Sequence, residues 1–216
     1  MKLLLNGQRL DNIQPEPETL GAALFAVQEQ HIREDQVIST IRVDGEPLTA
    51  ELLAEWKNRS VDDFDEAHIE ATTRNLLAAR GLIILADGLA ASKTDRDEIV
   101  DHLRQGRSSE AMTMLNSYLQ IWSGTQQSLL SAVRLLEIDI ESIEIYRPDS
   151  ESGEPKVGSL NDVLGSLTNN LNEIKSALKA QDMVLLGDIL EYEFVPLTEN
   201  WRDMLTQLAD RFENQY

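Results

Sequence analysis

The chain has 216 residues, of which 42% are hydrophobic and 26% charged, and these are the proportions of a globular protein of one or two domains. They exclude wholesale disorder, collagen-like repeats and low-complexity fibre. Cys is absent, which excludes disulfides, thiol nucleophiles and thiolate metal ligands. We expect a cytoplasmic protein with no signal peptide and no membrane span, because no apolar run approaches about 18 residues.

The net charge is −19, and the acidic residues are concentrated in two regions. Residues 1–72 carry 6 basic and 15 acidic side chains, and residues 137–216 carry 6 and 17. Residues 73–136 are close to neutral, with 7 basic and 6 acidic side chains. Binding to nucleic acid needs clustered Lys and Arg, and anionic lipid headgroups repel an acidic surface. We therefore expect neither a nucleic acid nor a membrane as partner.

Strand and helix signals alternate over residues 1–72. Asn6-Gly7 stands between two short extended runs and predicts a two-residue hairpin, because both residue types accept a positive φ. Thr19 is the expected N-cap of the helix that follows. That helix is expected to end near His31. The elements after it are expected to be a strand ending at Asp44-Gly45, a short helix over 50–57 and a strand over 67–71. On the first of these strands, Val37, Ser39, Ile41 and Val43 are expected on one side.

This order of elements resembles the β-grasp of ubiquitin-like folds, including the small sulfur carriers. The resemblance implies a small twisted sheet with a helix on one face, a surface that is often used for docking. Ubiquitin and the sulfur carriers act through a free Gly-Gly carboxyl end, whereas this region continues into Thr72-Thr73-Arg74. We therefore do not expect carrier chemistry.

Residues 73–216 show helical periodicity nearly throughout. A first helix is expected over 74–91, and a short second one, capped by Thr94 or Asp95, ends near Arg104. Gly81 and Gly88 lie seven residues apart in the first helix and suggest a close backbone approach. A long helix then carries an apolar residue at every seventh position: Leu115, Trp122, Leu129 and Leu136.

Periodicity is lost over residues 137–159, where a small β-excursion and a mobile loop are both compatible with the sequence. It resumes at Leu160, and a last apolar row runs from Leu186 to Phe212. Pro196 lies inside that row, so we expect a kink near Tyr192 and Glu193 or a broken helix.

The fold class is therefore α+β, with two expected domains. A small β-grasp-like domain occupies residues 1–72, and a mostly helical bundle of about four helices occupies residues 73–216. The bundle includes an irregular acidic excursion at about 137–159. Long apolar helix faces need to be covered, either within the bundle or by a second copy, so a homodimer is a reasonable expectation.

Recognisable catalytic chemistry is sparse. The three His residues lie in different elements, and there is no Gly-x-Ser-x-Gly, phosphate-loop or Gly-x-Gly-x-x-Gly motif. We therefore predict no catalytic residue, no cofactor and no metal. The strongest acidic group is Asp188, Glu191, Tyr192 and Glu193, just before Pro196, and it is the candidate site for a basic partner or a cation.

The Asp-x-Leu-Glu-Tyr-Glu segment over residues 188–193, joined to a β-grasp-like start, resembles an uncharacterised bacterial family to which we attach no activity. The function is thus unknown, and the leading hypothesis is a non-enzymatic protein-binding protein, adaptor-like or chaperone-like. One alternative is a metal-dependent or small-ligand-binding enzyme that uses the bundle carboxylates. Another is a purely structural homo-oligomer.

Overall fold

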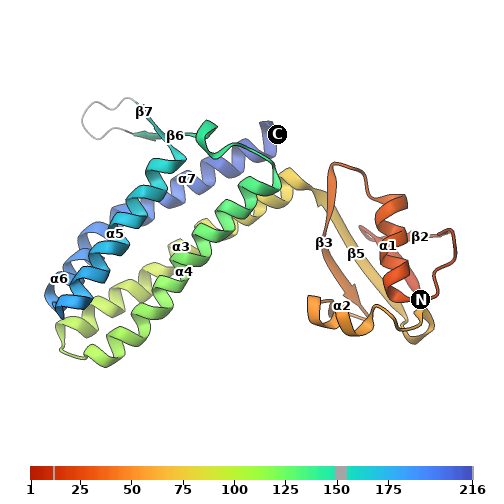
Figure 1. Cartoon of the computed structure of the whole chain (residues 1–216), viewed down its shortest axis with the longest axis horizontal. Helices are drawn as coiled ribbons and strands as arrows, with labels where there is room; N and C mark the ends of the chain where they lie inside the picture. The colour runs from red at the N-terminus through yellow and green to blue at the C-terminus, as the bar shows by residue number, and fades with distance from the viewer. Residues whose placement is uncertain (12, 149–154, 216) are drawn as a thin grey trace. The chain divides into compact units, whose positions relative to one another are not determined.

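The computed structural model describes residues 1–11, 13–148 and 155–215 (Figure 1). The chain folds into two compact units, Met1–Leu77 and Ala78–Tyr216, and each has its own cluster of buried apolar side chains. The first unit is a small mixed sheet with helices, and the second is mainly helical. The α+β class expected from the sequence is confirmed.

The first unit begins with the predicted hairpin of β1 (Lys2–Leu5) and β2 (Gln8–Leu10). Asn6 and Gly7 connect the strands with φ values of 50° and 78°, which are the positive values that this turn needs. The Asn6 side chain also donates to the Ala71 carbonyl at 3.1 Å and accepts from the Ala71 amide at 2.9 Å. The turn residue therefore ties the hairpin to a distant strand.

Five strands form the sheet of this unit in the order β2-β1-β5-β3-β4. The three later strands are β3 (Gln36–Val43), β4 (Glu46–Pro47) and β5 (Glu66–Thr73). β1 and β5 pair in parallel, and the other neighbours are antiparallel.

Helix α1 (Leu20–His31) packs on the sheet of the first unit. Its N-cap is Thr19, as predicted, with the Thr19 hydroxyl accepting from the Ala22 amide at 3.3 Å. Leu20 and Val27 are fully buried in the same cluster as sheet residues. The two other helical segments of this unit are α2 (Ala50–Trp56) and the 3₁₀ turn η1 (Val61–Asp63).

A bulge in β3 overturns part of the strand prediction. The register against β5 shifts between Ile38 and Thr40, so Ser39 is an extra residue. One extra residue reverses the alternation of faces along a strand. Val37 therefore lies on the opposite side of the sheet from Ile41, and the expected single-sided row is wrong.

In the described residues, the helical unit contains four long helices and one short one, so the expectation of about four is too low. The additional helix arises because the last apolar row is divided near Pro196. The helices are α3 (Arg74–Arg104), α4 (Ser108–Leu135), α5 (Leu160–Ala180), α6 (Met183–Asp188) and α7 (Phe194–Gln215).

Helix α3 is continuous over 31 residues, so the expected break before Thr94 or Asp95 is wrong. Arg96 and Ile99 are buried on the face that also buries Leu89, and the packed face therefore continues in phase through the polar stretch. Ser92 bonds to the Leu89 carbonyl at 2.8 Å and so sits within the helix without capping it.

Among the described residues, α3 is the helix that is long and apolar enough to cross a membrane by length and composition. Of its most apolar stretch of 18 residues, 33% is buried. Length and composition alone neither confirm nor contradict the expectation of no membrane span, which stays a prediction. Much of its apolar surface lies outside the bundle core.

Aromatic side chains form the centre of the bundle. Trp122 on α4 and Trp201 on α7 are fully buried and pack edge to face, with centroids 5.6 Å apart. Phe194 packs against Trp122 at the same centroid distance. Trp122, a member of the apolar row expected from the sequence, therefore lies in the core of the bundle.

Residues 137–159 contain a hairpin of β6 (Glu144–Pro148) and β7 (Pro155–Ser159) after a 3₁₀ turn, η2 (Ile140–Ser142). The expected irregular excursion is therefore ordered at these positions, while its centre, 149–154, lies outside the described residues. The Gln207 side chain on α7 holds β6 by bonding both the amide and the carbonyl of Tyr146, at 3.2 and 2.8 Å. Of the two alternatives, the β-excursion is the one found in the described part of this segment.

Candidate functional site

The four predicted site residues lie where α6 leads into α7. Asp188 ends α6, and Glu191, Tyr192 and Glu193 belong to a π-helical turn, η3 (Ile189–Glu193). In this wider turn the Phe194 amide bonds to the Ile189 carbonyl, five residues back. The α-helical pattern is thus interrupted just before Pro196, where the sequence predicted a kink or a break, but by a π-helical turn in a chain that stays helical.

Pro196 explains the interruption. It is the third residue of α7 and has no amide to donate to the carbonyl of Tyr192, and its ring crowds that carbonyl. The chain therefore widens over one turn before the helix of α7 continues. The Thr198 hydroxyl, which is buried, donates to the Phe194 carbonyl at 2.6 Å and so satisfies a backbone group next to the interruption.

Glu191 is the member of the predicted group that is already paired. It accepts a hydrogen bond from Arg104, at the C-terminal end of α3, and the two form an ion pair. This hydrogen bond and the charge of Glu191 raise the pKa of Arg104 above its ordinary value. Glu191 therefore connects two helices, and its carboxylate is less free for a partner than the sequence suggested.

Asp188, Tyr192 and Glu193 are exposed, and 65% of the Tyr192 surface is accessible to solvent. Across residues 1–11, 13–148 and 155–215, no three or more His, Asp or Glu side chains are grouped so as to hold a metal ion. The structure thus brings the predicted residues to one turn but not into a ligand set for a cation.

A groove beside this turn adds residues that the sequence analysis missed. It has a volume of about 260 Å³ and lies between α5, which contributes Asn172, Glu173 and Ser176, and the α6–η3 segment, which contributes Leu185 and Ile189. Ile189 is buried at the base of the groove, whereas Leu185 is 45% exposed.

Val184, next to Leu185, is 76% exposed, which is unusual for a large apolar side chain. Val184, Asp188 and Tyr192 follow one another at intervals of four residues, so the helical spacing places them along one side of the segment. We refer to Val184, Leu185, Asp188 and Tyr192, together with the groove at Ile189, as the α6 patch. The missed signal was the run Val184-Leu185-Leu186, since three successive apolar residues cannot all face the core of one helix.

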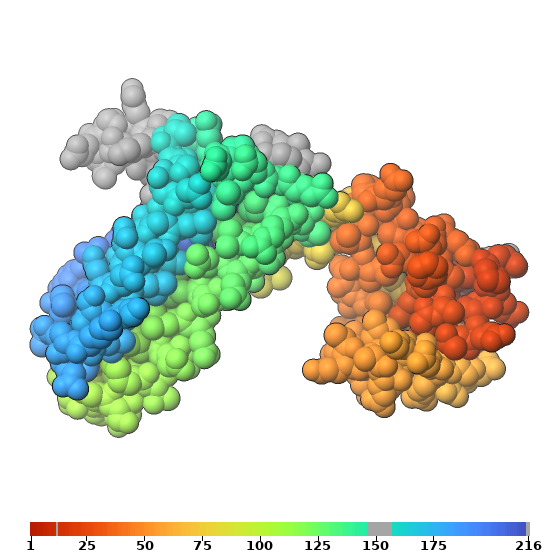
Figure 2. All heavy atoms as spheres, in the orientation of Figure 1, coloured from red at the N-terminus to blue at the C-terminus, as the bar shows by residue number. Residues whose placement is uncertain are grey.

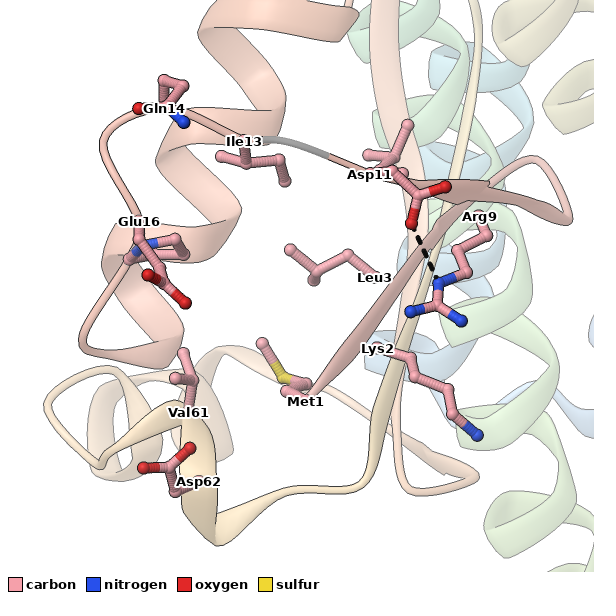
Figure 3. A pocket seen from close by; sticks show the side chains of 12 residues that line it. Met1, Lys2, Leu3, Arg9, Asp11, Ile13, Gln14, Glu16, Val61 and Asp62 are labelled. Atoms are coloured by element: carbon pink, nitrogen blue, oxygen red, sulfur yellow. Dashed lines mark ion pairs between the residues drawn. The ribbon is translucent and has the colours of Figure 1, made fainter.

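The first unit has a larger and more polar hollow, of about 430 Å³ (Figure 3). Met1, Leu3 and Ile13 point into it, and Arg9 pairs with Asp11 at 3.1 Å along its rim. None of the residues predicted from the sequence lines it. Its charged side chains are spread around the rim, and it has neither a nucleophile–base pair nor an anion cradle.

The chain is thus a two-part α+β protein, with a mixed sheet in one unit and an apolar patch bordered by carboxylates in the other. It belongs to the family described as "Domain of unknown function (DUF8042)", which matches residues 95–204. Residues 1–73 match a second description, "TP0873 N-terminal domain". The expected membership of an uncharacterised bacterial family is confirmed.

A relative from Treponema pallidum (strain Nichols), described as an uncharacterized protein, is 25% identical over 205 residues. That alignment covers 94% of this chain and 95% of the relative, so both parts of the chain occur together in it. No solved structure matches the chain. These comparisons attach no specific activity to the fold, in agreement with the unknown function expected from the sequence.

Proposed function

We propose that the chain is a non-enzymatic, adaptor-like or chaperone-like protein whose α6 patch binds a basic, amphipathic segment of a partner protein. The observation that carries this proposal is the exposure of Val184, Leu185 and Tyr192 beside an apolar groove with carboxylates at its margin. Exposed apolar side chains gathered in one place mark interaction surfaces in soluble proteins.

The charge around the α6 patch defines the partner. Glu173 lines the groove and Asp188 lies on the exposed side of the segment, so a bound helix would meet apolar contacts in the centre and carboxylates at the margin. An amphipathic helix with Lys or Arg beside its apolar stripe complements both features. The large negative net charge of the chain also favours the approach of a basic partner.

The π-helical turn supports the same location. Turns of this kind occur frequently at functional sites, where the extra residue re-aims the side chains around it. Here η3 carries Tyr192 at the surface while Leu190 stays buried, so the turn separates a surface aromatic side chain from the packed core. A Tyr that is apolar along its ring and polar at its tip suits a protein interface.

We also propose that the first unit is a β-grasp-like docking domain and that the protein works in the bacterial cytoplasm. The hairpin–helix–strand order, the strand order β2-β1-β5-β3-β4 and the parallel β1–β5 pair support the fold assignment. The lack of Cys is compatible with a reducing compartment.

A calorimetric titration with a synthetic amphipathic helix of Leu and Lys tests the proposed binding. The matched control is the same peptide with Glu in place of Lys. We expect the Lys peptide to bind, with an affinity about tenfold or more weaker at high salt, and the Glu peptide not to bind. Equal binding of the two peptides would contradict the proposed charge complementarity.

Two variants then locate the binding surface. Leu185→Lys and Asp188→Lys should each lower the affinity for the Lys peptide by about tenfold or more. Leu185→Lys removes an apolar contact, and both variants add a positive charge that repels the peptide. Asp203→Lys on α7 makes the same change of charge away from the α6 patch and serves as the control. If all three variants weaken the peptide equally, the α6 patch is not the site.

A further inference from the structure

An outward face of α3 has apolar side chains that the bundle leaves uncovered. Ile84 is 70% exposed and Ile83 is 39% exposed, although both lie in the middle of a long helix. A groove of about 330 Å³ runs beside them, lined by Ala79 and Arg80 from α3 and by residues of α7. Such a face in water favours coverage by another apolar surface.

The charges on this face are arranged symmetrically about the two isoleucines. Arg80 precedes Ile83 by three residues, and Asp87 follows Ile84 by three residues. Both charged side chains are exposed, and in the described part of the chain neither of them takes part in an ion pair. A two-fold rotation about the midpoint of Ile83 and Ile84 therefore places Arg80 of one helix opposite Asp87 of an identical antiparallel helix.

We propose that α3 is the interface of a homodimer, in which the α3 helices of two copies pack antiparallel about a two-fold axis through that midpoint. Ile83 then packs against the partner's Ile84. Arg80 pairs with the partner's Asp87, and the symmetry forms this pair twice. A two-fold interface requires a surface that is complementary to itself, and this sequence of charge, apolar pair and opposite charge meets that requirement.

The distribution of charge favours a second copy at this place. Residues 73–136, which include all of α3, carry 7 basic and 6 acidic side chains, whereas the regions on both sides are strongly acidic. Two copies that meet through α3 therefore meet at the least acidic part of the sequence, and the acidic side chains at the groove, Asp210 and Glu213, come from α7. The groove beside Ile83 and Ile84 also offers room for an apolar side chain of the partner.

Two glycines of α3 are also uncovered, but they lie on another side of the helix. At both Gly81 and Gly88, an added Cβ would meet nothing within 4 Å. The close backbone approach expected from their spacing therefore does not occur among the described residues. Both glycines lie about a quarter turn around the helix from the face of Ile83 and Ile84, so the proposed interface does not depend on them.

Exchange of the two charges tests the interface. We expect the full chain to be a dimer by light scattering, and Arg80→Asp and Asp87→Arg each to make it monomeric, because each places like charges opposite one another twice. The double variant R80D/D87R restores the pairing and should again be a dimer. An equimolar mixture of the two single variants should form a heterodimer, since one copy then has Asp and the other Arg at both positions.

A monomeric full chain, or a dimer that both single variants leave intact, would overturn the proposal. So would flotation of the chain with phosphatidylcholine vesicles that is lost in Ile84→Glu, since α3 would then meet lipid. All these variants lie outside the α6 patch, so binding of the Leu–Lys peptide should remain. Loss of dimerisation with intact peptide binding therefore separates this interface from the proposed function.

Discussion

Arg104 at the end of α3 donates a hydrogen bond to Glu191 in the π-helical turn, although the two residues are 87 positions apart in the sequence. The bond connects the candidate site to α3. Both side chains are partly exposed, at 59% and 35%. An ion pair with this exposure contributes little to stability, because solvent screens it. Its main effect is to hold the carboxylate of Glu191 towards α3.

Glu191→Gln is therefore predicted to have a small effect on both stability and binding. The midpoint of unfolding in a urea titration should hardly change. Affinity for the Leu–Lys peptide should change by less than about threefold, in contrast to Asp188→Lys, since Glu191 is occupied by Arg104. A loss of affinity as large as that of Asp188→Lys would show that Glu191 binds the peptide directly.

Trp201→Ala is predicted to be among the most destabilising changes in the bundle. Trp201 is fully buried and packs edge to face on Trp122, so its removal leaves a large cavity. Trp-to-Ala changes in a packed core cost about 3–5 kcal/mol. Denaturant unfolding followed by circular dichroism should show this loss.

Trp56→Ala in the first unit is the control for that measurement. Trp56 is only half-buried and packs against Phe64, with centroids 5.6 Å apart, so less contact is lost. We expect a smaller loss of stability than for Trp201→Ala. Equal losses of stability in the two variants would contradict the expectation that the more completely buried Trp contributes more to stability.

Local chemistry explains why parts of the fold could be predicted. Asn6-Gly7 specifies a hairpin and Thr19 a helix start through their own backbone preferences, so their signals are independent of distant residues. The same holds for Pro196, which removes one helical hydrogen bond wherever it stands. These predictions succeeded because each depends on a few adjacent residues.

Tertiary packing decided the features that the sequence analysis missed. The helix break expected at Thr94 did not form, because Arg96 and Ile99 continue the buried face of α3. The bulge at Ser39 is set by pairing with β5, which lies far along the chain. The site residues were predicted as an acidic group, but the apolar exposure of Leu185 depends on how α5 packs beside it. Periodicity alone cannot reveal such contacts.

Gly21→Ala is predicted to destabilise the first unit, although Ala is the better helix former. A Cβ at Gly21 would lie 2.8 Å from the Lys57 carbonyl oxygen, to which the Gly21 amide already donates a hydrogen bond. Helix propensity would favour Ala by about 1 kcal/mol, whereas overpacking of this kind costs about 1–3 kcal/mol. We expect the clash to dominate and thermal unfolding of the first unit to occur at a lower temperature.

Gly165→Ala on α5 is the matched control for Gly21→Ala. An added Cβ at Gly165 meets nothing within 4 Å, so only the propensity gain remains. The melting temperature should rise by a few degrees. A lower melting temperature for both variants would contradict the role assigned to the Lys57 carbonyl.

Tyr118→Phe is predicted to be tolerated at neutral pH and to remove a loss of stability at high pH. Burial raises the pKa of Tyr118 above its ordinary value of 10.0, and this effect exceeds the opposite effect of the neighbouring Trp122 and Thr198 side chains. The unfolded chain therefore releases this proton at a lower pH than the folded chain. The stability contribution is complete below about pH 10 and is lost as the pH rises above it, by about 1.4 kcal/mol per pH unit until the folded pKa is reached.

Urea titrations at several pH values should show this slope in the natural chain and in the exposed control Tyr192→Phe, but not in Tyr118→Phe. An unchanged slope in Tyr118→Phe would assign the loss to another group.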